Sequence, residues 1–365
     1  MSVLFQPAKI GNLTIKNRFV RSATAEGLAD EEGKPTAFLA GLYRQLAEND
    51  VGLIVTGHAF VHPMGRHSPA QTGIHRDENI PALKKLVEAV KGTDSKIMVQ
   101  INHAGRQSRP GVLKEQSLAP SAVPFGDGTY NPRAMTEGEI LETIQAFGQA
   151  ARRAREAGFH GIEIHAAHGF LISQFLSPHT NRRDDGWGGD EIGRRRFLLE
   201  VYARVREQVG RDYPVTMKLN SCDYLRNGLT LEESARIAAA MGKEGIDAIT
   251  VSGGMQERDD TPRPKTWDIK SPEEEAYFRS NAEAIRKAVG RLPLILVGGL
   301  RTPRVMEEIV EGSVADFVAL SRPFIMEPDL VKKIKTGSRE PAKCDTCNEC
   351  LQVPSLKCPP LDPSG

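Results

Sequence analysis

Two histidines stand at the end of a β-branched run in the segment IEIHAAHGFLISQFLSP, residues 162–178. An imidazole can bind a metal, transfer a proton, or donate a hydrogen bond to an oxygen that gains negative charge. His165 and His168 lack the i, i+4 spacing of a zinc-binding helix, and the nearest carboxylate, Glu163, lies two residues back. We interpret the pair as two donors for one substrate oxygen. The alternative is one structural and one exposed histidine.

Gln100 and Lys218 lie in similar apolar runs, KIMVQIN (96–102) and PVTMKLN (214–220). A carboxamide can donate to and accept from a ring edge that carries alternating C=O and N–H groups. A lysine can stabilise negative charge that develops on such a ring. Two alternatives stay open for Lys218: an ion pair with a carboxylate such as Asp223, and Schiff-base chemistry.

Two glycine- and arginine-containing segments near the end of the chain predict a phosphate site. They read VGGLRTP and ALSRPF, and they contain Gly298, Gly299, Ser321 and Arg322. Glycines let backbone N–H groups approach an anion, and an arginine adds a charge-assisted clamp. The alternative is two tight turns with a surface arginine.

Four of the five cysteines lie close together in the tail, with the spacing C-x2-C-x2-C-x7-C. They are Cys344, Cys347, Cys350 and Cys358, whereas Cys222 stands alone. Clustering of this kind indicates a metal rather than a disulfide framework. A [4Fe–4S] cluster and a structural zinc ion both fit four thiolates, and a tail without metal is the third possibility.

Eight short apolar runs alternate with amphipathic segments, which predicts parallel strands joined by helices. The runs cover residues 17–24, 52–57, 96–102, 161–165, 214–220, 247–253, 292–299 and 315–321. Eight even units favour a (β/α)8 barrel over a doubly wound sheet, and no G-x-G-x-x-G follows the first run. We expect an N-terminal hairpin below the barrel, a barrel domain over 1–337 and a Cys-rich tail over 338–365. The site should lie at the carboxyl ends of the strands.

Composition narrows the class of protein. The chain has 365 residues and a formal net charge of +1, which gives no electrostatic reason to expect nucleic acid or an acidic membrane as partner. No apolar run approaches the ~20 residues that span a bilayer. The first residues lack the apolar core of a signal peptide. We therefore expect a cytoplasmic protein.

Taken together, these segments resemble the Old Yellow Enzyme family of flavin-dependent oxidoreductases over residues 1–337. The resemblance rests on LTIKNRFVRSAT, QINHAGRQ, IEIHAAHGFLISQFLSPHTNRRDD with GWGG, and LVGGLRTP with ALSRPF. The tail cysteines resemble the branch that includes 2,4-dienoyl-CoA reductase and trimethylamine dehydrogenase, which carry an iron–sulfur cluster after the barrel. That branch continues into an FAD/NAD-binding half, which we do not expect here, because the chain ends at Gly365.

The resemblance implies FMN at the mouth of the barrel, with NADH or NADPH as reductant in a ping-pong cycle at one site. Lys218 would lie beside N1 and O2 of the ring, and His165 with His168 would bind the substrate's electron-withdrawing oxygen while hydride reaches its β-carbon. The expected cofactor-binding residues are Ala23, Thr24, Ala25, His58, Gln100, Lys218, Gly298, Gly299, Ser321 and Arg322.

Two residues depart from the family pattern. Phe170 occupies the position where many relatives carry a proton-donating tyrosine, so water, Cys222 or Tyr224 would have to supply the proton. Ala25 occupies a position where relatives often have Thr or Cys beside the flavin O4, so its side chain donates no hydrogen bond there.

The predicted function is reduction of the C=C bond of an α,β-unsaturated carbonyl compound by an FMN-dependent enzyme. The substrate would be an enone or an enoyl thioester. We also expect homo-oligomers, because relatives often form them. Three alternatives stay open. They are an amine dehydrogenase, a flavin module that passes electrons through a tail cluster to a partner protein, and a colourless aldolase that uses Lys218.

Overall fold

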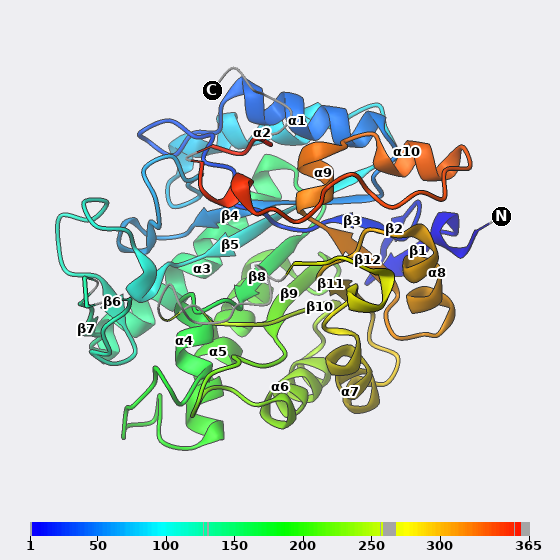
Figure 1. Ribbon diagram of the computed structural model, residues 1–365. Coiled ribbons are helices and arrows are strands. Elements are labelled where there is room, and N and C mark those ends of the chain that lie inside the picture. Colours follow the sequence, from blue (N-terminus) through cyan, green and yellow to red (C-terminus); the bar gives the residue numbers. More distant parts are fainter. Residues whose placement is uncertain are drawn as a thin grey trace.

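The computed structural model describes residues 2–126, 128–129, 131–255, 257, 268–353 and 355–358. Within these residues the chain forms a closed barrel of parallel strands, in the order β10-β11-β12-β3-β4-β5-β8-β9 (Figure 1). Its eight strands are β3 (Phe19–Arg21), β4 (Leu53–Phe60), β5 (Lys96–Asn102), β8 (Ile162–Ala166), β9 (Val215–Asn220), β10 (Ala248–Ser252), β11 (Leu294–Val297) and β12 (Phe317–Leu320). The eight predicted runs each overlap one of these strands, so the prediction of a (β/α)8 barrel is confirmed.

Helices surround the barrel, as the alternating pattern predicts (Figure 1). Their bounds are α1 (Ala37–Glu48), α2 (Ile80–Ala89), α3 (Glu137–Ala157), α4 (Leu171–Leu176), α5 (Glu191–Val209), α6 (Leu231–Glu244), α7 (Arg279–Val289), α8 (Pro303–Glu311), α9 (Arg322–Met326) and α10 (Leu330–Lys335). Local signals fix the ends of α3: Thr136 and Glu139 form a capping box, and Gly158 ends the helix with φ 89°.

The predicted N-terminal hairpin is present as β1 (Ala8–Ile10) and β2 (Leu13–Ile15), which pair antiparallel. Ile10 and Ile15 are fully buried, and they pack into one apolar cluster with strand residues that include Met98, Ala248 and Phe317. The hairpin therefore closes the apolar end of the barrel interior.

The barrel interior changes from apolar to polar along the strands. Successive inward positions of a strand are two residues apart, so Met98 is followed by Gln100, and Ala248 by Thr250. Met98 and Ala248 belong to the apolar cluster, whereas Gln100 and Thr250 hydrogen-bond to the buried Glu163. The carboxyl end of the barrel thus holds a buried polar layer, which is the end where a site is expected.

Some elements lie outside the predicted βα repeat. The short strands β6 (Leu118–Ala119) and β7 (Arg133–Ala134) pair in parallel within the long β5–α3 connection. The helix α4 follows Phe170 directly, and all six of its residues are buried. Its first backbone N–H, from Leu171, donates to the carbonyl of His103, which anchors the segment after the histidine pair to the β5 loop.

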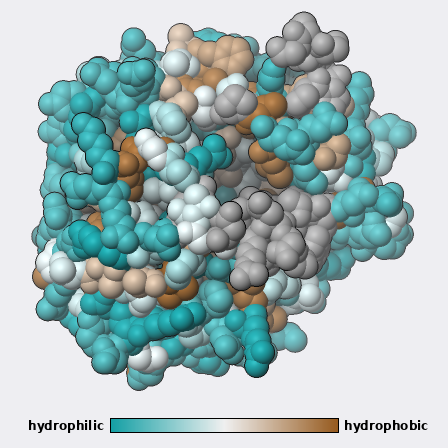
Figure 2. Space-filling model, turned by 60° about the vertical axis from the view of Figure 1, so that its left-hand side comes forward, coloured by the Kyte–Doolittle hydropathy of each residue, from teal (hydrophilic) through white to brown (hydrophobic). Residues whose placement is uncertain are grey.

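The tail from 338 onward runs along the barrel (red and orange-red in Figure 1). Ala342 N donates to Arg301 O over 2.9 Å, and Leu356 N donates to Glu26 O over 2.7 Å. Residue 354 and residues 359–365 of the predicted tail domain lie outside the described residues, and the division at 337/338 stays a prediction. The face drawn in Figure 2 is mostly hydrophilic, with apolar residues in small separate groups. Among the helices in the described part of the chain, none has the length and apolar character to cross a bilayer.

Candidate active site

The histidine pair lies where β8 ends. His165 is 3% exposed, and its ring lies 5.2 Å from the ring of His168 at an interplanar angle of 83°. The Nδ1 atom of His165 accepts the backbone N–H of Ala167 over 3.3 Å, so the ring proton belongs on Nε2. Burial lowers the pKa of His165 well below its usual value, with further lowering by the nearby His168, Lys218 and His58. His165 is therefore a neutral N–H donor.

His168 is half-buried and is held on three sides. Its φ is 60°, an uncommon backbone conformation that its neighbours fix, since Asn220 Oδ1 accepts its N–H over 2.9 Å and Gln107 Nε2 donates to its carbonyl over 2.8 Å. Its Nε2 lies 2.8 Å from the hydroxyl of Ser252 at the end of β10. The ends of β9 and β10 and the turn at Gly105–Gln107 after β5 therefore hold this residue, and Ser252 contacts its ring.

Phe170 packs among imidazole rings. Its ring centroid lies 4.8 Å from that of His165, 4.9 Å from that of His58 and 5.5 Å from that of His67. The position that departs from the family pattern is thus inside the histidine cluster, where a donor at that place would reach the same space. Phe170 supplies an apolar ring there and no proton.

His58, at the end of β4, has a fixed tautomer. Its Nδ1 lies 2.6 Å from Gln71 Nε2 and 3.3 Å from Asn102 Nδ2, and both amide nitrogens are donors. The same Gln71 nitrogen donates to the His58 carbonyl over 3.0 Å, which supports this amide orientation. The ring proton is therefore on Nε2. Burial lowers the pKa of His58 to about 3, with smaller contributions from the cations nearby, so the ring is neutral.

Gln100 and Lys218 meet through a carboxylate at the barrel axis. Gln100 Nε2 donates to Glu163 Oε1 over 2.7 Å, and Lys218 Nζ lies 3.5 Å from the same oxygen. The other carboxylate oxygen accepts the hydroxyl of Thr250 over 2.6 Å, and Lys218 also donates to Ser22 Oγ over 3.0 Å. Burial lowers the pKa of Lys218, and Glu163 opposes that shift.

The ion-pair alternative for Lys218 is therefore realised with Glu163 rather than with Asp223. Asp223 instead accepts hydrogen bonds from Asn220 Nδ2 over 2.9 Å and from the backbone N–H of Leu229 over 2.8 Å.

The predicted phosphate residues come together at the ends of β11 and β12. Thr24 Oγ1 lies 2.7 Å from Ser321 Oγ, which joins the end of β3 to the end of β12. Gly298 and Gly299 have φ values of 132° and 70°, and the ring of Tyr277 lies where a Cβ at either position would go. Backbone N–H groups in such a conformation form a concave surface for an anion.

Three further predicted residues lie around this region. Arg322 begins α9, and its Nη1 donates to Asn348 Oδ1 over 2.5 Å. Ala23 is half-buried and Ala25 is exposed at the open side of the β3 end. A methyl group at position 25 offers no hydrogen bond, as the sequence implies.

The two predicted substitutes for the missing tyrosine lie against α7. The hydroxyl of Tyr224 accepts a hydrogen bond from Asn281 Nδ2 over 3.1 Å, and its ring lies 6.2 Å from that of Phe278. Cys222 is half-buried, and its sulfur accepts the backbone N–H of Tyr224 over 3.3 Å. Burial raises the pKa of the Cys222 thiol, which keeps it protonated at neutral pH.

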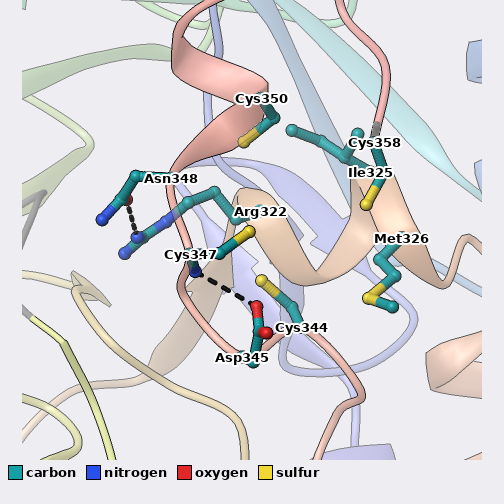
Figure 3. A pocket seen from close by; sticks show the side chains of 9 residues that line it. All are labelled: Arg322, Ile325, Met326, Cys344, Asp345, Cys347, Asn348, Cys350 and Cys358. Atoms are coloured by element: carbon teal, nitrogen blue, oxygen red, sulfur yellow. Dashed lines mark hydrogen bonds between the residues drawn. The ribbon is translucent and has the colours of Figure 1, made fainter. Parts of the chain in front are cut away.

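The four tail cysteines line one small pocket beside α9 (Figure 3). Their sulfur atoms point toward a common space, which Arg322, Ile325 and Met326 also border. Within the described ranges, no group of three or more His, Cys, Asp or Glu side chains is arranged to hold a single metal ion.

Sequence reasoning missed four residues that organise the site: Glu163, Gln71, Ser252 and Asn220. Glu163 was noticed only as a neighbour of the histidines. A buried strand interior that contains a carboxylate is itself a signal, because such a charge needs partners. Gln71 and Ser252 carry no such signal, since their partners are 13 and 84 residues away.

Several of the residues suit an FMN group. Gln100 and Lys218 are buried polar groups near the ends of β5 and β9, as the edge of a flavin ring requires, and Gly298 and Gly299 follow β11 with positive φ, where a phosphate is expected. The family model for the NADH:flavin oxidoreductase / NADH oxidase family matches residues 3–340. The chain belongs to this family, which includes Old Yellow Enzyme.

Individual relatives agree with this assignment. The chain is 40% identical to an NADH oxidase of Thermoanaerobacter brockii over 349 residues, which are 94% of this chain and 52% of that protein. It is 39% identical to an NADPH dehydrogenase of Geobacillus sp. (strain WCH70) over 90% of this chain and 92% of that one. The solved complex of 2-naphthoyl-CoA reductase with 2-naphthoyl-CoA aligns with a TM-score of 0.87 and 30% identity, over 95% of this chain and 54% of that chain. The chain spans about half the length of the first curated relatives it matches.

Proposed function

We propose that this protein reduces the C=C bond of α,β-unsaturated carbonyl compounds, with NADH or NADPH and the substrate reacting in turn at one site. The observation that carries the proposal is the pair of imidazoles held over the flavin position. His165 is a neutral Nε2–H donor, and His168 is fixed by Ser252. FMN, when bound, supplies the hydride.

The two imidazoles act on the oxygen of the substrate. Hydride addition to the β-carbon moves negative charge onto the carbonyl oxygen, and donors placed in advance stabilise that charge more than they stabilise the substrate. His165 suits this task, because as a neutral ring it donates its Nε2–H without adding a positive charge to the buried site. Lys218 stabilises the charge on the pyrimidine side of the reduced cofactor.

Enones and enoyl thioesters are both candidate substrates. The solved neighbour with a TM-score of 0.87 holds 2-naphthoyl-CoA, which is an unsaturated aryl thioester. A thioester carbonyl presents the same oxygen to the histidine pair as a ketone does. Suitable probes are 2-cyclohexen-1-one and cinnamoyl-CoA, tested with NADH and with NADPH. Initial-rate lines that stay parallel when the second substrate is varied support the proposed order of reaction.

The test of the histidine roles uses a phenol, because a phenolate mimics the charged oxygen. The FMN-loaded protein is titrated with 4-hydroxybenzaldehyde, and the change in the flavin spectrum gives Kd. We expect His165→Ala combined with His168→Ala to weaken binding at least about 100-fold, since two charge-assisted hydrogen bonds are lost. His160→Gln, at the opposite end of β8, is the control. Equal affinities in the double variant and the control would reject the assignment.

A second function, electron transfer through an iron–sulfur cluster, has one specific observation in its favour. The sulfur atoms of Cys344, Cys347, Cys350 and Cys358 point toward the same pocket. In a [4Fe–4S] cluster each thiolate binds a different iron, so its sulfurs stand further apart than around zinc. An anaerobic preparation should contain about four irons per chain. Less than one iron per chain after anaerobic reconstitution would contradict a role of the tail in electron transfer.

A further inference from the structure

Glu163 is the centre of the polar layer beneath the flavin position. Its side chain is 1% exposed, and its two oxygens contact Gln100 from β5, Lys218 from β9 and Thr250 from β10. A buried carboxylate costs several kcal/mol unless charged or polar partners satisfy it. These three partners come from three different strands, so the arrangement is built by the barrel and not by local sequence.

We propose that Glu163 is a positioning residue of the flavin site, which turns the Gln100 amide toward the cofactor and holds the ammonium charge of Lys218 under the ring. This inference rests on the FMN-dependent chemistry of the family, and it adds a residue that contacts neither substrate nor hydride.

The orientation of Gln100 follows from its hydrogen bond. Its Nε2 donates to Glu163 Oε1 over 2.7 Å, and the described residues offer no donor to its Oε1. A carboxylate accepts hydrogen bonds and cannot donate them. Glu163 therefore selects the Gln100 orientation in which the amide nitrogen faces the carboxylate. The carbonyl oxygen of Gln100 then faces the mouth, where it can accept the imide N–H of a flavin ring.

The charge on Lys218 follows from the groups around it. Burial lowers the pKa of Lys218, and the nearby guanidinium of Arg21 on β3 lowers it further. Arg21 is paired with Glu26 over 2.8 Å. Glu163 is the carboxylate that contacts Lys218, at 3.5 Å, and it opposes these effects. Without it, Lys218 resembles other buried lysines that lose their proton near or below neutral pH.

The first experiment measures how many protons accompany reduction of the bound FMN. Glu163→Gln removes the negative charge but keeps a carbonyl oxygen for Gln100, so it isolates the effect on Lys218. The midpoint potential of the full chain with FMN is measured from pH 6 to pH 9. We expect the slope of potential against pH to rise about twofold in Glu163→Gln, because Lys218 then takes up a proton on reduction. Thr250→Val keeps the carboxylate and should keep the wild-type slope. A wild-type slope in Glu163→Gln overturns the proposal.

The second experiment uses the protein without cofactor, so it stands apart from flavin binding. Unfolding is followed in urea for Glu163→Gln, Lys218→Met and the double variant. If the two charges compensate one another, the double variant is more stable than the sum of the two single losses predicts. A single variant that fails to fold while the double variant folds supports the same conclusion. Additive losses, or a double variant that fails where Lys218→Met folds, overturn it. If the wild-type protein binds no FMN, the proposed flavin chemistry is refuted. The coupling between Glu163 and Lys218 measured by urea unfolding would still stand.

Discussion

The rings of His58 and Phe170 lie 4.9 Å apart, and their contact brings β4 and the β8–α4 connection to the same side of the mouth. The imidazole presents an Nε2–H, because Gln71 and Asn102 occupy Nδ1. The phenyl ring presents only carbon. The space above the flavin position is therefore lined by an N–H donor and an apolar ring where many relatives have a phenol.

Phe170→Tyr should increase alkene reduction. The new hydroxyl would lie in the histidine cluster and supply the proton for the α-carbon, and positioned acids contribute about 100- to 10,000-fold in favourable cases. We expect a rise of about tenfold in the rate at which reduced enzyme is reoxidised by 2-cyclohexen-1-one. Phe170→Leu removes the ring without adding a hydroxyl, so it separates proton donation from packing. An equal rise in both variants would contradict the explanation.

Ser252→Ala should weaken phenol binding without loss of fold. The hydroxyl lies 2.8 Å from His168 Nε2, and its loss frees the ring from one of its constraints. We expect Kd for 4-hydroxybenzaldehyde to rise by about five- to tenfold, which corresponds to about 1 kcal/mol for one hydrogen bond. The matched control is Ser234→Ala, whose hydroxyl bonds the Asn220 carbonyl on the outer side of β9. Unchanged binding in Ser252→Ala would show that His168 needs no such support.

The sequence predicts the barrel well because its signals are local. Strand runs, amphipathic helices and stops such as Gly158 each lie within one βα unit. Eight repeats then leave few topologies, and the strand ends fall on one side. His165, Gln100, Lys218 and the phosphate glycines could be chosen from their place in those runs alone.

The partners of these residues could not be predicted, because they come from other strands. Glu163 meets Lys218 across 55 positions of sequence, and only closure of the barrel sets their 3.5 Å separation. The fixed tautomer of His58 likewise depends on Gln71, which follows the strand in a loop of irregular structure. Contacts between side chains on different strands leave no repeating pattern in a single sequence.

Acid should destabilise the protein below about pH 6.5. Burial lowers the pKa of His58 and of His103 to about 3, from 6.5. Between these values the unfolded chain binds protons that the folded chain does not, so stability is complete above pH 6.5 and falls as pH decreases. Each such histidine contributes about 1.4 kcal/mol per pH unit in that window. Urea unfolding at pH 7.0, 5.5 and 4.5 measures how the free energy of unfolding depends on pH. His58→Gln should reduce by about one the number of protons taken up on unfolding. A flat profile would contradict the burial of these neutral rings.

Gly299→Ala should weaken FMN binding through the phosphate cradle. A Cβ there would lie 2.8 Å from two ring atoms of Tyr277, at a φ of 70°, so the backbone has to move away from its anion-binding conformation. Gly290→Ala is the matched control, because its φ is 61° and nothing lies within 4 Å of the added carbon. Both variants place an alanine at a positive φ, and only the first disturbs the cradle. We expect FMN Kd, measured by quenching of flavin fluorescence, to rise at least about tenfold in Gly299→Ala and to stay near wild type in Gly290→Ala. Equal affinities in the two would place the phosphate elsewhere.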